Sequence, residues 1–324
     1  MRIAFAILAA AAALAVTPAA AQFRAPEHKA EWPGMVSGSD GIEGLDPGPE
    51  LQRGRSARAM LADARKLNVA LNALQPQRKA LVDAYIVSVA LDSDPVFARE
   101  AREAGKVLSR RFDAAGRTIV LAGSTGTMPS ELPNGSLTSL TLALARIAEV
   151  MDKEQDVLVL YATSHGAQVG IAYHDGDEGY GILSPRRLQT LLDELGIRNR
   201  VLILSACYSG IFVGPLSSPD TALFTAASSD RPSFGCEAHN DWTFFGDAMI
   251  NHALRKNQPL EKASDEARMM IGDWEGAARV PPSNPQVSIG DHVAAWLAPL
   301  EARMPQTDTP PVGRPSTDAL KTGE

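Results

Sequence analysis

Short apolar runs alternate with amphipathic segments along most of this chain, and that alternation restricts the folds open to it. Runs rich in Val, Ile and Leu predict strands, whereas apolar positions three or four residues apart predict helices. Strands that alternate with helices form a mostly parallel sheet with helices on both faces. The sequence therefore predicts an α/β fold, specifically a three-layer α/β/α sandwich. The predicted strands are 84–91, 118–122, 156–163, 200–206, 222–227 and 286–289, and the predicted helices are 96–112, 137–151, 185–195, 242–256 and 259–274. A short hairpin is also expected from 168–173 and 179–183.

The composition fits such a sandwich and argues against some partners. Hydrophobic residues make up 45% of the chain, which is enough for a full core. The net charge is −7 and no basic stripe is present, which argues against a nucleic-acid partner. The two cysteines, Cys207 and Cys236, are too few for a fold that depends on disulfides. No glycine-rich phosphate loop is present, and we predict neither a cofactor nor a metal site.

The first 21 residues have the pattern of a secretory signal peptide. Arg2 provides a positive start, residues 3–16 are apolar, and residues 19–21 offer the small side chains that signal peptidase requires. An uncleaved membrane anchor is the alternative, but the apolar run is too short to span a bilayer. No later segment is long and apolar enough to do so. We therefore predict a periplasmic or secreted protein whose mature chain begins at Gln22.

Three further regions are expected in the mature chain. Residues 22–75 form a leader or linker, in which 22–50 is rich in Pro and Gly and 51–74 has helical spacing. Residues 76–302 contain the alternating strands and helices and form the main domain. Residues 303–324, rich in Pro, Thr and Asp, predict a disordered tail. The leader or the tail could cover a cleft in a latent form of the protein.

Two of the predicted strands end in side chains that can take part in catalysis. The strand from Val157 continues into His165 and Gly166, and the strand from Val201 continues into Cys207. Ligands and chemistry collect at the carboxyl ends of parallel strands. A Cys and a His in that position indicate nucleophilic catalysis by a thiolate. The backbone N–H groups of Gly166 and Cys207 are natural donors to an oxyanion.

These motifs resemble those of a known family. Residues 161–166 read Tyr-Ala-Thr-Ser-His-Gly, and residues 205–210 read Ser-Ala-Cys-Tyr-Ser-Gly. The two stretches are similar to the strand ends of the legumain-like (asparaginyl endopeptidase) cysteine peptidases, particularly the bacterial branch, within the caspase–hemoglobinase group. Residues 227–236 and 243–247 also match that family in order and spacing. The resemblance covers roughly residues 80–300.

The resemblance implies a fold, an activity and roles for individual residues. A caspase–hemoglobinase-like domain is expected, with Cys207 as nucleophile, His165 as general acid or base, and a peptide or protein as substrate. Gly166 and Cys207 would supply the oxyanion N–H groups. Ser205, Ser233 and Asp247 fall at positions that bind substrate in the family.

The chain departs from the family pattern at two places. Ser205 replaces a Glu two residues before the nucleophile, and residues 92–95 directly after the strand 84–91 contain no Arg in register, so Asn or Asp specificity is not implied. The residue that supports the histidine is also open, with Asp92 and Asp94 as the candidates.

Alternatives remain for the cysteines and for the function. Cys236 is interpreted as a buried structural thiol rather than as a disulfide partner or redox switch for Cys207. His174 lies among acidic residues that a solvated turn explains better than a metal site.

The leading hypothesis for the function is an exported cysteine endopeptidase. A transpeptidase that uses the same thioester and a non-catalytic binding or scaffold module are the alternatives. The sequence does not indicate an oligomeric state.

Overall fold

The computed structural model describes residues 48–123 and 130–321. The predicted signal peptide and the first part of the predicted leader lie outside these residues. Among the described residues, no helix is long and apolar enough to cross a membrane.

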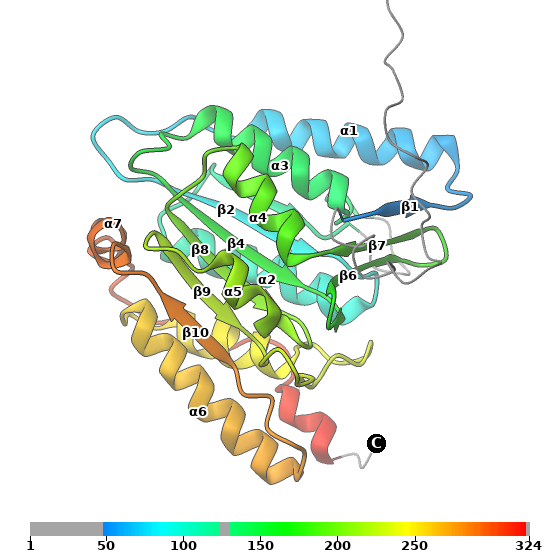
Figure 1. Ribbon diagram of the computed structural model, residues 1–324, viewed down its shortest axis with the longest axis vertical. Helices are drawn as coiled ribbons and strands as arrows, with labels where there is room; N and C mark the ends of the chain where they lie inside the picture. Colours follow the sequence, from blue (N-terminus) through cyan, green and yellow to red (C-terminus); the bar gives the residue numbers. More distant parts are fainter. Residues whose placement is uncertain (1–47, 124–129, 322–324) are drawn as a thin grey trace, which may run out of the picture.

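A six-stranded sheet forms the centre of the molecule (Figure 1). Its strand order is β10-β9-β8-β4-β2-β3, and all neighbouring pairs are parallel except β10 with β9. The strands are β2 (Ala84–Ala90), β3 (Thr118–Leu121), β4 (Val157–Thr163), β8 (Arg200–Ser205), β9 (Thr221–Thr225) and β10 (Gln286–Ile289). The predicted mostly parallel sheet is therefore confirmed.

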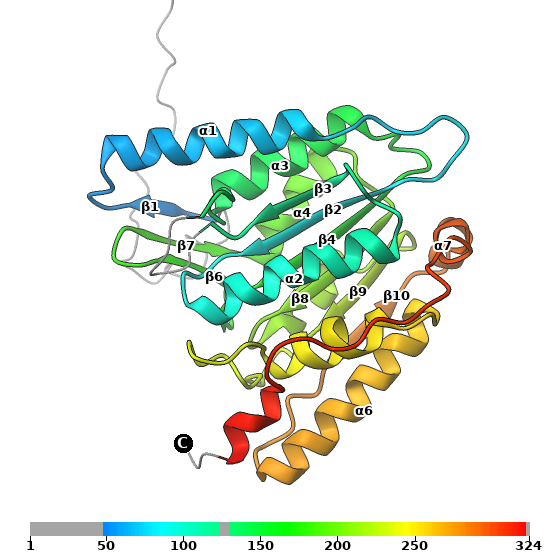
Figure 2. The same ribbon diagram turned by 180° about the vertical axis from the view of Figure 1, so that it is seen from behind.

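Helices cover both faces of this sheet, which confirms the predicted three-layer α/β/α fold. Figure 1 shows one helical layer in front of the sheet, and Figure 2, turned by 180°, brings the other layer forward. The first layer contains α1 (Ala57–Ala73), α3 (Leu137–Val150), α4 (Pro185–Glu194) and α5 (Val213–Leu216). The second contains α2 (Pro95–Arg111), the π-helical η3 (Gly246–His252), α6 (Leu260–Ala278) and α7 (Val293–Glu301).

Strand side chains alternate between the two layers because successive residues point to opposite faces. In β4, Leu158 and Leu160 join the core on the α3 side, while Val159 and Tyr161 join the core on the α2 side. Every residue of β2, β4 and β8 is buried. That two-sided burial explains why these strands are continuous apolar runs in the sequence.

A small second sheet borders the carboxyl edge of the main sheet. Its order is β1-β7-β6-β5, and all pairs are antiparallel. The strands are β1 (Glu50–Gln52), β5 (Gly166–Ala167), β6 (Gly170–Asp175) and β7 (Gly179–Leu183). The β6–β7 hairpin was expected from the sequence. By contrast, β1 occupies the start of the helix expected at 51–74, and α1 begins only after Ser56, whose side chain caps Ala59 N.

The C-terminal segment also differs from expectation. Residues 303–321 follow a defined path across the α2, η3 and α6 layer, visible as the red segment in Figure 2. Trp242 Nε1 donates to Val312 O at 2.8 Å, and Asn251 both donates to and accepts from the Val312 backbone. Side chains from the domain thus supply the hydrogen bonds that this Pro-rich segment cannot make within itself.

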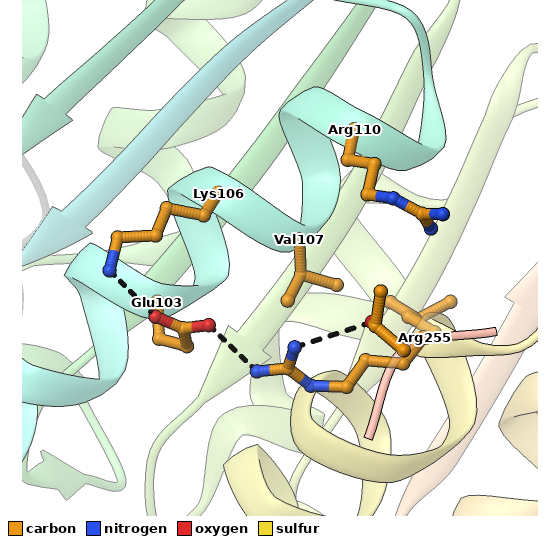
Figure 3. Close-up of a pocket in the computed structure, with 7 residues that line it drawn as sticks. Glu103, Lys106, Val107, Arg110 and Arg255 are labelled. Carbon is orange, nitrogen blue, oxygen red and sulfur yellow. Dashed lines mark hydrogen bonds and ion pairs between the residues drawn. The ribbon is translucent and has the colours of Figure 1, made fainter. Parts of the chain in front are cut away.

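An ion-pair cluster lies at the border between α2 and this segment (Figure 3). Arg255, from the 3₁₀ turn η4 (Ala253–Arg255), pairs with Glu103 at 2.7 Å and donates to Thr309 Oγ1 at 3.4 Å. Lys106 also pairs with Glu103. These residues and Arg110 line a small cavity. The contact between the C-terminal segment and the domain is therefore polar at this place.

Candidate active site

Strand register brings the two predicted catalytic residues to neighbouring positions. In the parallel pair β4–β8, Thr163 lies opposite Ser205, and these are the last residues of the two strands. His165 and Cys207 each follow two residues later. Neighbouring strands are about 4.8 Å apart, so the two residues leave the sheet side by side. A Cβ added to Gly166 would overlap the carbonyl oxygen of Cys207, which shows how closely the two segments approach.

Cys207 lies in a tight turn between β8 and a short 3₁₀ helix, η2 (Ser209–Phe212). Tyr208, directly after it, adopts a left-handed conformation with φ of 59°, which is uncommon for a residue with a side chain. The Cys207 thiol is free and half-buried. Ser233 N–H donates to its Sγ at 3.3 Å, and the Ser233 carbonyl lies 3.5 Å from the same sulfur. The turn therefore presents the sulfur toward the segment around Ser233.

The His165 ring contacts two residues at the start of α2. Its Nε2 lies 3.5 Å from Asp94 Oδ2, and both side chains are partly exposed, at 43% and 45%. The Phe97 ring packs edge-on against the imidazole, with 5.0 Å between ring centroids. A carboxylate at one ring nitrogen and an aromatic ring beside it restrict the orientation of the imidazole, as general acid–base catalysis requires.

Asp92 lies behind this contact and is almost fully buried. Its Oδ1 accepts the Asp94 N–H at 2.8 Å, whereas Oδ2 has no hydrogen-bond partner among the described residues and lies 3.5 Å from His174 Nδ1. Burial raises the pKa of Asp92, while the Asp94 N–H and the nearby His165 act in the opposite direction. Of the two carboxylates that the sequence left open, Asp94 is the one in direct contact with His165.

The predicted oxyanion donors belong to Cys207 itself and to the neighbouring Gly166. Gly166 is in contact with the Cys207 backbone, as described above. Among the residues that the structure describes, no backbone hydrogen bond uses the N–H of Cys207. A backbone N–H without a backbone partner, beside the Gly166 segment, is the kind of donor that can stabilise a tetrahedral oxyanion.

The predicted substrate-binding residues occupy three different environments. Ser233 contacts Cys207 and therefore lies in the site. Ser205 is buried, and its hydroxyl donates to Glu100 at 3.1 Å. Asp247 is fully buried, where it accepts hydrogen bonds from Asn251 Nδ2 at 2.8 Å and from the Ser316 N–H at 2.7 Å. Substrate binding by Ser205 or Asp247 stays a prediction, and neither position favours it.

The second cysteine lies near the first. Cys236 is half-buried rather than fully buried, and it packs against the apolar cluster that contains Phe97. Burial raises the pKa of the Cys236 thiol to about 11, and the neighbouring Cys207 adds to the rise. Cys236 is therefore a protonated, weakly nucleophilic thiol at neutral pH.

One residue of this region was missed by the sequence reasoning. Glu100 is fully buried on the inner face of α2, among Phe97, Ala101 and Ala104. Its position was detectable in principle, because a carboxylate on the apolar face of an amphipathic helix is unusual and needs partners. Those partners were not detectable, since they come from other parts of the chain.

Comparison with known proteins supports the resemblance. The model of the Peptidase C13 family matches residues 140–274, which include both strand-end motifs. This match confirms the resemblance to legumain-like peptidases and supports cysteine peptidase activity in general. No curated protein matches the chain. A crystal structure of caspase-1 from Spodoptera frugiperda aligns with a TM-score of 0.42 and 12% identity, covering 67% of this chain and 88% of that chain.

Proposed function

We propose that this protein is a cysteine endopeptidase in which Cys207 attacks the peptide carbonyl and His165 transfers the protons. The observation that supports the proposal is the register of β4 and β8, in which Thr163 pairs with Ser205, so that His165 and Cys207 each follow two residues after the last pair of these strands. A buried structural cysteine does not require a histidine at the next strand end. The half-buried thiol and the partly exposed imidazole are both accessible to a substrate.

The proposed reaction proceeds through a thioester. The Cys207 thiolate adds to the carbonyl carbon, and the N–H groups of Gly166 and Cys207 hold the resulting oxyanion. The protonated His165 gives its proton to the leaving amine as the C–N bond breaks. His165 then takes a proton from water, which attacks the thioester and releases the acid, so that the Cys207 thiolate and the protonated His165 are regenerated. Asp94 orients the imidazole and stabilises its protonated form.

The test is cleavage of a diverse peptide library by the chain from Gln22 onward, with products read by mass spectrometry. Cys207→Ala removes the nucleophile, so we expect loss of all cleavage with an unchanged melting temperature. The matched control is Cys236→Ala, which removes the other thiol and should retain activity. Cleavage that survives Cys207→Ala would rule out the mechanism. Absence of cleavage by the parent chain would favour the binding-module alternative, and ligation of an added amine would indicate a transpeptidase.

We also propose export through the N-terminal segment, on the basis of its charge and apolar pattern. The expected result is a periplasmic or secreted protein whose first residue is Gln22, as determined by N-terminal sequencing after cell fractionation. Recovery of the chain with residues 1–21 still attached would contradict this proposal.

A further inference from the structure

Glu100 receives hydrogen bonds from three separate parts of the chain. Its Oε1 accepts the hydroxyls of Tyr161, Thr163 at 2.7 Å and Ser205 at 3.1 Å. Its Oε2 accepts both the backbone N–H and the hydroxyl of Thr243, at 2.8 and 2.9 Å. Five donors therefore converge on one fully buried carboxyl group.

Two of these donors stand at the ends of the two strands that lead to the proposed catalytic residues. Thr163 and Ser205 face each other as the last residues of β4 and β8. Each lies two residues before a proposed catalytic residue, His165 in one case and Cys207 in the other. A single carboxyl oxygen thus joins the two strand ends where the backbone ladder stops and the catalytic turns begin.

The same helix also contacts the imidazole directly. Asp94, Phe97 and Glu100 are spaced three residues apart, so they share one side of the start of α2. The first two contact His165, as described above, and the third holds the strand ends. The start of α2 therefore supports both the ring and the backbone that carries it.

The surroundings of Glu100 accommodate a buried carboxyl group through hydrogen bonds and through the space left at Gly246. Among the described residues, no Lys or Arg pairs with it, and burial raises the pKa of Glu100 while its hydroxyl and amide donors act against the rise. A buried carboxyl is tolerated only when its oxygens are satisfied. The absence of a side chain at Gly246 is also required, because a Cβ there would overlap the carboxylate.

We infer that Glu100 is a positioning residue of the active site, which fixes the ends of β4 and β8 so that His165 and Cys207 keep their catalytic separation. This inference rests on the proposed peptidase function. The competing explanation is that Glu100 only stabilises the fold, in the way that any satisfied buried polar group does.

The test compares two isosteric substitutions of buried carboxylates. In the parent chain the donors bind both carboxylate oxygens of Glu100. In Glu100→Gln only one acceptor oxygen remains, so part of this hydrogen-bond network is lost. We expect kcat to fall about 10- to 100-fold with little change in KM, because small displacements of reacting groups have effects of that size. The matched control is Asp156→Asn, at the opposite end of β4, where a fully buried carboxylate accepts the N–H groups of Asp83 and Asp152. It should lower the melting temperature and leave kcat unchanged.

A second readout does not depend on peptide cleavage. In a Cys236→Ala background Cys207 is the sole thiol, so its alkylation by iodoacetamide can be followed against pH. Displacement from His165 should move the Glu100→Gln curve to higher pH, because the thiolate loses its partner. The Asp156→Asn curve should coincide with that of the parent. If the parent cleaves no peptide, the proposed function fails, and the alkylation curves still decide the role of Glu100.

The inference is overturned if Glu100→Gln matches Asp156→Asn in both kcat and alkylation. If Glu100→Gln yields no folded protein, Thr163→Val replaces it, because that isosteric change removes one donor and keeps the carboxylate. A smaller shift of the alkylation curve in the same direction is then expected. An unshifted curve for Thr163→Val would equally overturn the inference.

Discussion

At the scale of single residues, Asp94 and Asp92 make separable contributions beside His165. Asp94 touches the imidazole at 3.5 Å, and Asp92 lies behind it with one oxygen unpartnered among the described residues. We expect Asp94→Asn to lower kcat about tenfold, less than for a fully buried carboxylate, since this pair is partly solvated. Steady-state kinetics on the peptide found in the library screen would measure the change.

The control for Asp94→Asn is Asp265→Asn, which neutralises a carboxylate on α6 that is also exposed and is paired only with Arg268 among the described residues. Its kinetics should equal those of the parent. If Asp92→Asn impairs turnover and Asp94→Asn does not, the supporting role belongs to Asp92 instead, and the imidazole must then turn toward the buried carboxylate.

At the scale of elements, the sequence predicts well what local pattern determines. The strands β2, β4 and β8 are continuous apolar runs because both their faces are buried. The start of α4 was equally readable, since Ser184 caps Arg187 N and Pro185 occupies the first turn. The strands β1 and β5 are two or three residues long and exist only through their pairing with β7 and β6, so no local pattern encodes them.

The same distinction separates the predictable from the unpredictable parts of the site. Cys207 and His165 were identifiable because reactive residue types stand directly after two strong strands. The segment expected as a helix at 242–256 is instead π-helical and then 3₁₀. Within it, Asp247 bonds to Ser316, and that partner is distant in sequence. Glu100 was missed for the same reason, because its donors come from β4, β8 and the Thr243 segment.

At the scale of the whole molecule, the C-terminal segment acts as a strap across one helical layer. The backbone of Val312 forms hydrogen bonds with the Asn251 side chain, and the backbone N–H of Ser316 donates to the Asp247 side chain. Asn251 and Asp247 are both buried. Arg314 reaches the neighbouring segment through Asp241. Among the described residues, none of the hydrogen bonds of this segment goes to His165 or Cys207. The geometry therefore favours a stabilising strap over a cover that keeps the site latent.

Truncation after Arg303 should accordingly destabilise the protein rather than activate it. Losing the partners of Asn251 and Asp247 leaves buried polar groups unsatisfied, at a cost on the order of 3 kcal/mol. For a domain of this size that cost corresponds to a fall in melting temperature of roughly 6–12 °C, measurable by calorimetry.

A finer comparison isolates the strap's own hydrogen bonds. Val312→Pro removes the N–H that Asn251 Oδ1 accepts at 2.9 Å, whereas Val312→Ala keeps it and changes only a side chain that is 41% exposed. We expect Val312→Pro to lower the free energy of unfolding by about 1 kcal/mol and Val312→Ala to have little effect.

A truncated chain with an unchanged melting temperature and higher peptidase activity would instead identify the segment as an inhibitory cover. In that case the contacts of the C-terminal segment with η3 would have to affect the site indirectly, by way of Asp241 and the neighbouring segment around Cys236.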